Sequence, residues 1–359
     1  MTLGVTLDDL IFDFSVYPRA MQGGGVLKAV IKQELTDFVV DEIPDWQADP
    51  AGTHLYVQVE KSDLTTQELI KQFAEHFGLM QEQIGHAGLK DRRAVTTQWL
   101  SLAGVSQAAV EAWEGSERFR CSSFARGASR IKEGQLLGNR FKILLRAPDD
   151  RGFDAGDAAA IEAALITLQQ VGVPNYYGPQ RFGRDRDNAR RGLYLLRQGK
   201  GRSKRWLDRL CINSLQSLIF NDWVAARLQA GTLNQVIKGD IAHKHATFGK
   251  FLVDDAAREN PRAVSFEISA TGPMLGRKYH EAQFDARDIE DGVLATRGLT
   301  RDDFKPCLGS RREGRVLLSH VAVELAEAGI WLRFALPRGA YATSVLREFV
   351  AVECLSGCE

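Results

Sequence analysis

Residues 85–101 have the sequence Gly85-His-Ala-Gly-Leu-Lys-Asp-Arg-Arg-Ala-Val-Thr-Thr-Gln-Trp-Leu-Ser101. Two glycines precede a cluster of one carboxylate and three cations, Lys90-Asp91-Arg92-Arg93, and the run from Val95 to Leu102 predicts a strand. The acid therefore lies in a turn beside a strand, where nearby positive charge favours the ionised form of its carboxyl group. Taken alone, such a cluster is more often a solvated charged turn, so the rest of the chain has to decide between the two interpretations.

Length and composition describe an ordinary globular protein. A chain of 359 residues is comfortable for two domains at roughly 100–200 residues per domain. Hydrophobic residues make up 44% and charged residues 26%, which allows a sizeable core. Lysine plus arginine and aspartate plus glutamate both number 46, so the net charge gives no indication of a nucleic-acid partner.

Several absences predict a cytoplasmic protein. The five cysteines are odd in number and mostly scattered, which argues against a disulfide framework and for a reducing compartment. Cys354-x-x-x-Cys358 could belong to a metal site, but no second pair lies nearby in the sequence. The N-terminus lacks the basic and apolar regions of a signal peptide, and no run of about 18 apolar residues predicts a membrane span.

The first half of the chain mixes strands and helices without a regular βαβ alternation, which favours an α+β fold. A capping box of Thr65 and Glu68 and a stop at Gly78 predict one helix between them. Further helices are predicted over 106–113 and 157–171. Strands are predicted over 27–31, 38–40, 54–59, 95–102, 119–129 and 140–146.

The character of the sequence changes after Val171 and changes back near residue 314. A Gly/Pro/aromatic loop at 174–183 precedes a segment, 188–228, in which helical patterns dominate. The sequence is then polar and irregular over 239–276, and a helical pattern follows near 281–292. Strands return over 314–318, 321–325 and 329–336. The order strand-rich, helix-rich, strand-rich predicts a second domain inserted into the first.

Positive charge is concentrated in two segments. Residues 118–146 contain eight basic side chains and one acidic side chain, and residues 181–205 contain ten basic and two acidic ones. Aromatic residues such as Phe119, Phe141 and Tyr176 lie among them, as stacking on unpaired bases would require. A surface that follows a phosphate backbone and an ordinary solvated surface are about equally compatible with these segments alone.

Motifs of other common chemistries are missing from the sequence. It contains no Walker A loop, no GxGxxG after a strand, no HExxH, no GxSxG and no CxxC pair. His243-Lys-His245 is a weak metal pattern and more often a polar loop. Catalysis without a cofactor or metal, based on carboxylates and cations, is the expectation.

Four blocks of the sequence, in order, form one pattern. The central block is Gly88-Leu-Lys-Asp-Arg-Arg-Ala-Val-Thr-Thr-Gln-Trp99. The flanking blocks are Ile31-Lys-Gln-Glu-Leu-Thr-Asp-Phe-Val-Val-Asp-Glu-Ile-Pro44, Gly138-Asn-Arg-Phe-Lys-Ile143 and Phe334-Ala-Leu-Pro-Arg-Gly-Ala-Tyr-Ala-Thr-Ser-Val-Leu-Arg-Glu348. Together they resemble the tRNA pseudouridine synthase D family, and residues 174–184 are similar to the start of that family's inserted domain.

The resemblance implies isomerisation of uridine to pseudouridine at position 13 of tRNA, without cofactor or metal. It also implies a mixed, largely antiparallel catalytic sheet with flanking helices, and a helix-rich α/β domain inserted into it. The expected division is 1–164 and 315–359 for the catalytic domain and 165–314 for the insertion. The expected partner is tRNA, and no obligate protein partner or membrane is indicated.

The resemblance also implies roles for residues of the pocket. Asp91 is the expected catalytic carboxylate, as nucleophile or as base at the ribose, and Lys32 is the cation expected to pair with it. Phe38 and Phe141 would border the base, Asn139 would bond the uracil edge, and Tyr341 would line the pocket. Each has an ordinary alternative: a solvated lysine, core phenylalanines, a turn asparagine and a half-buried strand tyrosine.

Five basic residues are candidates for contact with RNA: Lys90, Arg92, Arg93, Arg181 and Arg184. The first three could contact phosphate or Asp91 itself. Two other classes of function compete with the enzyme. An RNA-folding chaperone on the same scaffold is disfavoured because Asp91 is present, and a nuclease is disfavoured because no carboxylate cluster suited to Mg²⁺ is evident.

Overall fold

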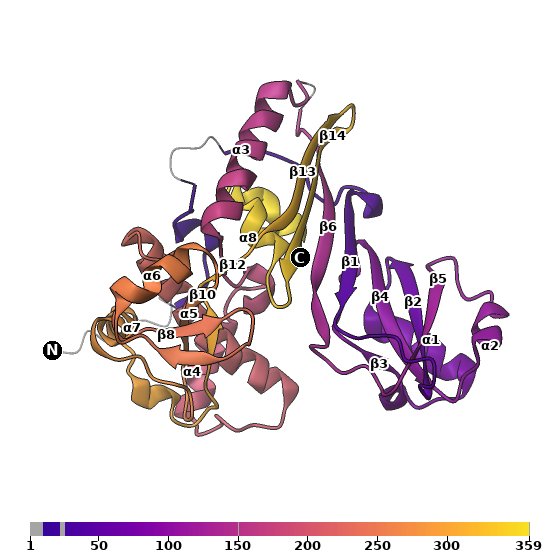
Figure 1. The fold of residues 1–359 in the computed structure, drawn as a ribbon, viewed down its shortest axis with the longest axis horizontal. Coiled ribbons are helices and arrows are strands. Elements are labelled where there is room, and N and C mark those ends of the chain that lie inside the picture. Colours follow the sequence, from indigo (N-terminus) through magenta and orange to yellow (C-terminus); the bar gives the residue numbers. More distant parts are fainter. Residues whose placement is uncertain (1–9, 22–25, 150, 359) are drawn as a thin grey trace.

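The computed structural model describes residues 10–21, 26–149 and 151–358, and Figure 1 shows their arrangement. An eight-stranded sheet runs through the molecule, with strand order β13-β14-β6-β1-β4-β2-β5 and β3 paired to β4. Its strands are β1 (Phe38–Pro44), β2 (His54–Ser62), β3 (Gly85–His86), β4 (Val95–Ala103), β5 (Phe119–Gly127), β6 (Leu136–Leu145), β13 (Ser319–Ala326) and β14 (Gly329–Pro337). All neighbours pair antiparallel except β1 and β4, which confirms a mixed, largely antiparallel α+β fold.

Helices cover the two halves of this sheet. Helix α1 (Thr66–Phe77) packs Leu69, Ile70 and Phe73 onto β2 and β4. Its predicted capping box is present, and Gly78 ends it in the left-handed conformation. Helices α3 (Ala155–Val171) and α8 (Ala342–Leu346) share a core with β1, β6 and β14. The short helix α2 (Gln107–Glu111) precedes β5.

The predicted strand over residues 27–31 is not formed. Leu27 and Val30 make only isolated bridges, to Val350 and Arg146. Lys32 has φ 58°, a left-handed conformation that ends any extended run at this point. Extended backbone resumes only at Phe38, after a turn of 3₁₀ helix (Leu35–Asp37).

Residues 175–314, here called the middle segment, form a second unit with its own sheet. Its entry and exit lie side by side, because β7 (Val173–Pro174) pairs with β12 (Arg315–Val316). The sheet has the strand order β11-β10-β8-β9. These strands are β8 (Ile241–Lys244), β9 (Lys250–Leu252), β10 (Ile268–Met274) and β11 (Ser310–Glu313); the helices are α4 (Asn188–Arg197), α5 (Trp206–Gln229), α6 (Ala256–Val264) and α7 (Phe284–Thr296).

The prediction of irregular structure over 239–276 is therefore wrong. Strand β10 escapes detection because its sequence, ISATGPM, contains glycine, proline and small polar residues that are uncommon in strands. All seven residues are buried. Gly272 lies against Trp223 of α5, and a Cβ there would stand 2.4 Å from the indole ring, so only glycine permits this approach. The Thr271 hydroxyl donates to the Ile241 carbonyl at 2.5 Å, which satisfies the buried polar group.

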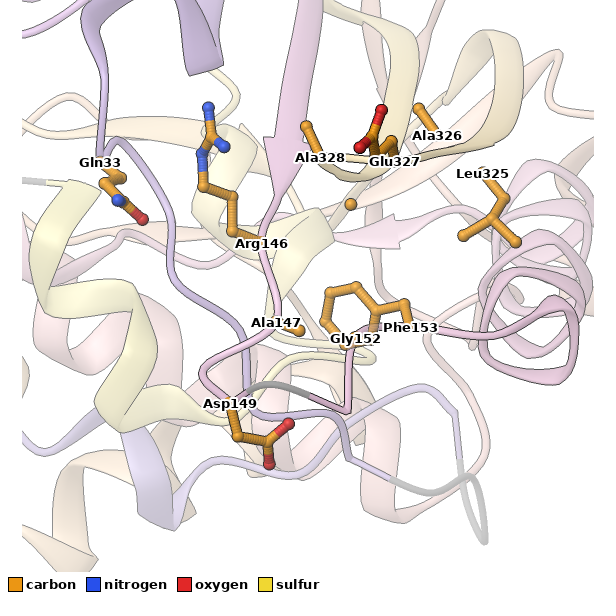
Figure 2. Close-up of a pocket in the computed structure, with 11 residues that line it drawn as sticks. Gln33, Arg146, Ala147, Asp149, Gly152, Phe153, Leu325, Ala326, Glu327 and Ala328 are labelled. Carbon is orange, nitrogen blue, oxygen red and sulfur yellow. The ribbon is translucent and has the colours of Figure 1, made fainter.

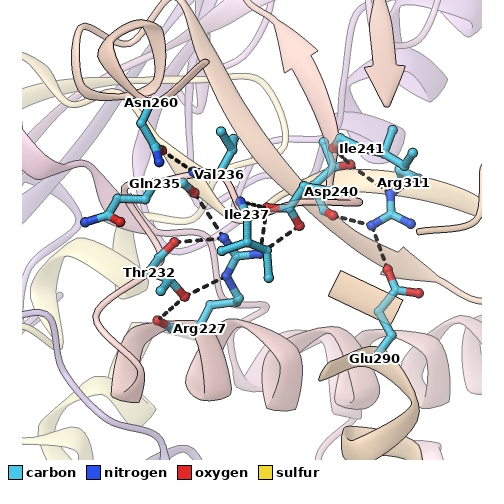
Figure 3. A network of polar contacts seen from close by, with 11 residues as sticks. Arg227, Thr232, Gln235, Val236, Ile237, Asp240, Ile241, Asn260, Glu290 and Arg311 are labelled. Atoms are coloured by element: carbon cyan, nitrogen blue, oxygen red, sulfur yellow. Dashed lines mark hydrogen bonds and ion pairs between the residues drawn. The ribbon is translucent and has the colours of Figure 1, made fainter. Parts of the chain in front are cut away.

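A buried polar network fixes the middle segment internally (Figure 3). The guanidinium of Arg227, on α5, donates to both carboxylate oxygens of Asp240 at 2.7 and 2.9 Å and to the Thr232 carbonyl at 2.9 Å. Arg311, on β11, pairs with Glu290 of α7 at 2.7 Å. Buried charges are tolerated when paired and hydrogen-bonded in this way. The network therefore holds α5, α7 and the sheet in one arrangement.

Short 3₁₀ helices occupy the remaining turns: Phe14–Val16, Leu35–Asp37, Gln81–Gln83, Pro179–Phe182, Arg301–Phe304 and Val352–Cys358. Among the described residues, no helix is both long and apolar enough to cross a membrane.

Candidate active site

The loop that carries Asp91 connects β3 to β4 beside β1. Gly85 pairs with Ser101 so closely that a Cβ at position 85 would meet the Ser101 hydroxyl at 2.3 Å and the Ile131 carbonyl at 2.4 Å. The glycine that opens this stretch is thus required by strand packing. Because β4 runs parallel to β1, with Val95 opposite Val39, the loop delivers Asp91 to the start of β1.

Asp91 is paired with Lys32. The Lys32 Nζ lies 2.9 Å from Asp91 Oδ2, and the lysine side chain is 2% exposed while that of the aspartate is 39% exposed. The same ammonium lies 4.1 Å from the centre of the Phe38 ring. A buried ammonium is stable only with such partners. The pair therefore joins a buried ammonium group to a carboxylate that is still exposed to solvent.

The backbone of Lys32 is held in an unusual conformation. Its positive φ of 58° costs of order 1–3 kcal/mol for a residue with a side chain. The Arg93 guanidinium donates to the Lys32 carbonyl at 3.2 Å. Arg93 is therefore tied to the backbone of the lysine that pairs with the acid, while much of its surface stays exposed.

A pocket of about 200 Å³ opens beside the Asp91 carboxylate. It is lined by Phe38, Val40, Leu89, Lys90, Asp91, Asn139, Phe141, Gln180, Ala340, Tyr341, Ala342 and Thr343. The volume is below the roughly 300–1,000 Å³ of pockets for drug-sized ligands, and it suits one small planar ring. Five of the six predicted catalytic and substrate-binding residues line this pocket, and the sixth, Lys32, is bonded to Asp91.

The aromatic wall of the pocket follows from strand register. Phe141 on β6 lies opposite Val40 of β1 and Phe334 of β14. The rings of Phe141 and Phe334 stack with centres 5.3 Å apart, and Phe38 meets Phe141 edge-on at 6.2 Å. Phe38 and Phe141 are 3% and 9% exposed, so they belong to the core and border the pocket at once.

Asn139 lies two residues before Phe141 and therefore on the same face of β6. Its Oδ1 is buried and has no hydrogen-bond partner within the described structure. A buried amide oxygen without a partner costs about 1–3 kcal/mol. The site therefore retains an unused polar group on the wall that faces Asp91, as a hydrogen-bonding ligand would require.

The far wall joins the two units of the fold. Tyr341 caps the start of α8, and its ring lies 6.0 Å from that of Tyr177 in the middle segment. Burial, above all, raises the pKa of the Tyr341 hydroxyl. Gln180 enters the pocket from the 3₁₀ helix Pro179–Phe182. Gly178 allows the close approach, since a Cβ there would stand 2.7 Å from the Thr343 hydroxyl.

Lys90 does not fit the expectation of contact with phosphate or with Asp91. Its ammonium is 2.8 Å from Glu42 Oε2, and the two side chains are 5% and 1% exposed. The lysine turns inward because Glu42 is buried on β1 and needs a counter-charge. Arg92, in contrast, is half-exposed and lies 3.1 Å from Asp63 and 3.7 Å from Glu68.

The two predicted RNA contacts of the middle segment lie near the pocket. The Arg181 Nε donates to the Ser217 hydroxyl at 3.1 Å, and its guanidinium lies 5.2 Å from the Tyr177 ring centre. Arg184 is exposed, and its side chain has no partner among the described residues.

A larger cavity of about 620 Å³ lies elsewhere, at the end of β6 beside the β13–β14 turn (Figure 2). It is lined by charges of both signs, including Arg146, Asp149 and Glu327. Arg146 is already engaged by the buried Asp37 at 2.7 Å. Burial would raise the pKa of Asp37, but hydrogen bonds from Arg146 and from backbone amides lower it overall. This cavity offers no unused polar group comparable to Asn139 among its described lining residues, and we do not assign it to the reaction.

A family model described as tRNA pseudouridine synthase D matches residues 15–200 and 201–349. The chain belongs to the tRNA pseudouridine synthase D family. The resemblance expected from four sequence blocks is confirmed, and with it the expectation of an enzyme of the isomerase class.

Individual members of the tRNA pseudouridine synthase D family match almost the whole chain. A tRNA pseudouridine synthase D from a strain of Thermus thermophilus is 46% identical over 351 residues, 98% of this chain and 97% of the relative. One from an Anaeromyxobacter species is 36% identical over 330 residues, 89% and 92% of the two chains. A crystal structure from Methanosarcina mazei assigned to the same family shares the fold, with a TM-score of 0.76 at 22% identity, covering 98% of this chain and 99% of that one.

Sequence reasoning missed two side chains, Lys61 and Thr66, that hold the Asp91 loop of this family member. The Lys61 ammonium donates to the carbonyls of Leu64 at 2.5 Å and Asp91 at 2.8 Å. The Thr66 hydroxyl accepts from the Lys90 amide and donates to Gln98 Oε1, both at 2.9 Å. A signal for Lys61 existed: in the alternating strand 54–62 it follows Leu55, Val57 and Val59 on the inward face.

Metal ligands are not grouped in the described part of the chain: no three His, Cys, Asp or Glu side chains lie together so as to hold an ion. His243 of the weak His-x-His pattern is bonded instead to Glu313 at 2.9 Å, and His245 to the Ser269 hydroxyl at 2.9 Å. The Cys358 side chain lies outside the described residues.

Proposed function

We propose that this protein isomerises uridine to pseudouridine at position 13 of tRNA and that Asp91 is the reacting carboxylate. The observation that carries the proposal is the Asp91–Lys32 pair at 2.9 Å, placed at the edge of a pocket of one-ring size. The relatives' names supply the reaction and the RNA. The pocket supplies a carboxylate, an aromatic wall and an unused amide in one place.

The reaction breaks the bond between N1 of uracil and C1′ of the ribose, turns the base and forms a bond from C5 to C1′. The proton on C5 is released to water and N1 takes one up, so the composition is unchanged and no oxidant or reductant is needed. An ionised carboxylate can assist by attacking C1′ or by removing a ribose proton, and the half-exposed Asp91 is placed for either step.

The remaining pocket residues would hold the base. The free Asn139 amide would bond the uracil edge, with Phe141 bordering one side of the ring and Tyr341 the other. Lys32 would hold the Asp91 carboxylate in position without contacting the base. Because the pocket is enclosed between two units of the fold, the target uridine must leave its stack in the RNA, which costs a few kcal/mol.

We propose three parts for the chain, as the sequence predicts, with one boundary moved. Strand β14 pairs with β6, and β13 pairs in turn with β14, which supports a catalytic domain built from both ends of the chain. The expected boundary at residues 164 and 165 would cut α3, a continuous helix over Ala155–Val171 that packs on β13. We therefore place the insertion between β7 and β12, at residues 175–314.

The test is release of tritium from [5-³H]uridine-labelled tRNA. Wild type is expected to release tritium, and Asp91→Asn, which keeps shape and removes the charge, is expected to lose activity by at least about 10³-fold. Asp63→Asn, at an exposed aspartate that pairs with Arg92, is the matched control and should retain activity. Equal release by wild type and Asp91→Asn would refute the role of Asp91. Tight tRNA binding with no release by wild type would favour an RNA chaperone.

A further inference from the structure

A groove of about 430 Å³ lies in the middle segment, away from the catalytic pocket. The loop after α4, the first turns of α5 and the residues following β10 form its walls. Four cations line it: Arg202, Lys204, Arg209 and Arg277. No aspartate or glutamate is among its described lining residues. We call this feature the basic groove.

The four cations of the basic groove are not ion-paired, although Asp208 lies beside the groove and accepts from the Ser203 hydroxyl at 2.7 Å. None of their side chains makes an ion pair or a hydrogen bond to another described residue, and all four are exposed. Several other arginines of the middle segment are paired, as Arg262 is with Glu259 at 2.5 Å. Like charges gathered without acids repel one another and raise the local concentration of anions. The arrangement suits a ligand of repeated negative charge.

Two exposed aromatic residues belong to the helices on either side of the groove's loop. Trp206, the first residue of α5, is 68% exposed, and Tyr194 of α4 is 62% exposed. Tyr194 lines a separate cavity that also includes Leu207 of α5. Exposed aromatic rings next to unpaired cations are typical of surfaces on which bases stack while phosphates are held.

One face of α5 connects the groove to the catalytic pocket. Arg209 and Asn213 line the groove, and Ser217, one further turn along, accepts from Arg181. Residues four apart share a face of a helix, and Arg209 to Ser217 span about 12 Å at 1.5 Å per residue. Arg181 follows Gln180 of the pocket directly. The basic groove therefore lies along α5 from Ser217, the residue that holds Arg181 next to Gln180 of the pocket.

We propose that the basic groove is a second RNA-binding site, which holds the phosphodiester backbone of the substrate RNA beyond the nucleotides that surround the reacting uridine. The inference rests on the proposed function, because it takes the RNA in the pocket to be the same molecule. The groove increases the affinity for the RNA and fixes the position of the RNA on the protein, and the reaction itself takes place at Asp91.

The test compares two double variants that each remove two positive charges from the middle segment. Arg202→Ala/Lys204→Ala removes cations of the groove, and Lys250→Ala/Arg287→Ala removes exposed cations that lie outside it. The Kd for tRNA is measured from low to moderate salt. The groove variant is expected to bind about tenfold more weakly, to have a higher KM, and to lose about two units of the slope of log K against log salt. The control should match wild type.

The outcomes separate this inference from the proposed function. Equal Kd and slope for the two double variants would refute the groove as an RNA site, whatever the activity. Failure of wild type to release tritium from tRNA would refute the proposed function instead. If inorganic pyrophosphate binds wild type but not the groove variant, while both bind tRNA equally, the site takes free phosphate compounds and the inference fails.

Discussion

The ammonium of Lys61 holds the Asp91 loop in place through the loop's backbone, although Lys61 lies outside the central sequence block. Lys61 is 1% exposed, and its ammonium donates both to the Leu64 carbonyl, just after β2, and to the Asp91 carbonyl in the loop. We expect Lys61→Met to lower kcat at least about tenfold with little change in KM, because small displacements of a reacting group are costly. The two orphaned carbonyls would also cost about 1–3 kcal/mol each.

Steady-state kinetics on tRNA, with Lys71→Met as control, would measure this effect. Lys71 is exposed on the neighbouring helix α1 and pairs with Glu75, which is exposed as well. A Lys61→Met enzyme with normal kcat would show that the loop keeps its position without the clamp.

The same lysine predicts a pH dependence of stability. Burial lowers the pKa of Lys61 to about 8, and Asp91 opposes the shift. The unfolded chain, with its lysine pKa near 10.4, binds more protons between the two values. The contribution of this group to stability therefore grows as pH rises from about 8 to about 10.4, and it is lost as pH falls back to the folded pKa. Urea unfolding at pH 7 and pH 10 should show that wild type gains stability relative to Lys61→Met. If the difference in stability between wild type and Lys61→Met is the same at both pH values, the ammonium of Lys61 is more solvated than this argument requires.

The residues of the pocket can be predicted from the sequence to different degrees. Asp91, Lys32, Asn139 and Phe141 are found because they belong to contiguous blocks. Gln180 and Thr66 are not, since their roles depend on contacts between separate elements. Lys90 departs from its predicted contacts for the same reason: nothing in its own neighbourhood reveals that Glu42 on β1 needs a partner.

Among the elements, β10 shows why packing can override strand propensity. Gly272 leaves room for the Trp223 ring of α5. We expect Gly272→Val to destabilise the protein by about 1–3 kcal/mol through overpacking. A Cβ added at Gly292 of α7 would meet nothing within 4 Å, so Gly292→Ala should be neutral or stabilising by up to about 1 kcal/mol. Thermal unfolding of both variants compares them, and equal melting temperatures would contradict the packing argument.

Elements with local signals are predicted well. Helix α1 has its caps in the sequence, and α3 has the periodicity of Ile161, Leu165 and Leu168, all buried. The missing strand at 27–31 and the unpredicted β10 are the reverse case. The first depends on the positive φ of Lys32, and the second depends on the packing of Gly272 against Trp223 of α5. Local residue preferences predict neither of these.

At the scale of the whole molecule, one basic segment reaches the pocket and the other begins next to it. Asn139 of the pocket lies within residues 118–146, and Arg181, the first of residues 181–205, directly follows Gln180 of the pocket. Some of these cations are already paired, as Arg120 is with Glu60 and Arg146 with Asp37. If about four of the other cations contact phosphate, the Kd for tRNA should rise roughly a hundredfold between 50 and 200 mM salt. Filter binding or fluorescence anisotropy would measure it, and a Kd independent of salt would remove these segments from the RNA interface.

The pairing of β14 with β6 has a consequence for how the protein is made. During synthesis Phe141 leaves the ribosome long before Phe334, its partner across the sheet. Until then β6 is an open edge, and open edges invite pairing with other chains. The pocket also lacks Tyr341 and Thr343, which emerge later still. The nascent chain is therefore inactive and most prone to aggregate just before completion, and a truncation before β14 should yield insoluble protein rather than a slow enzyme.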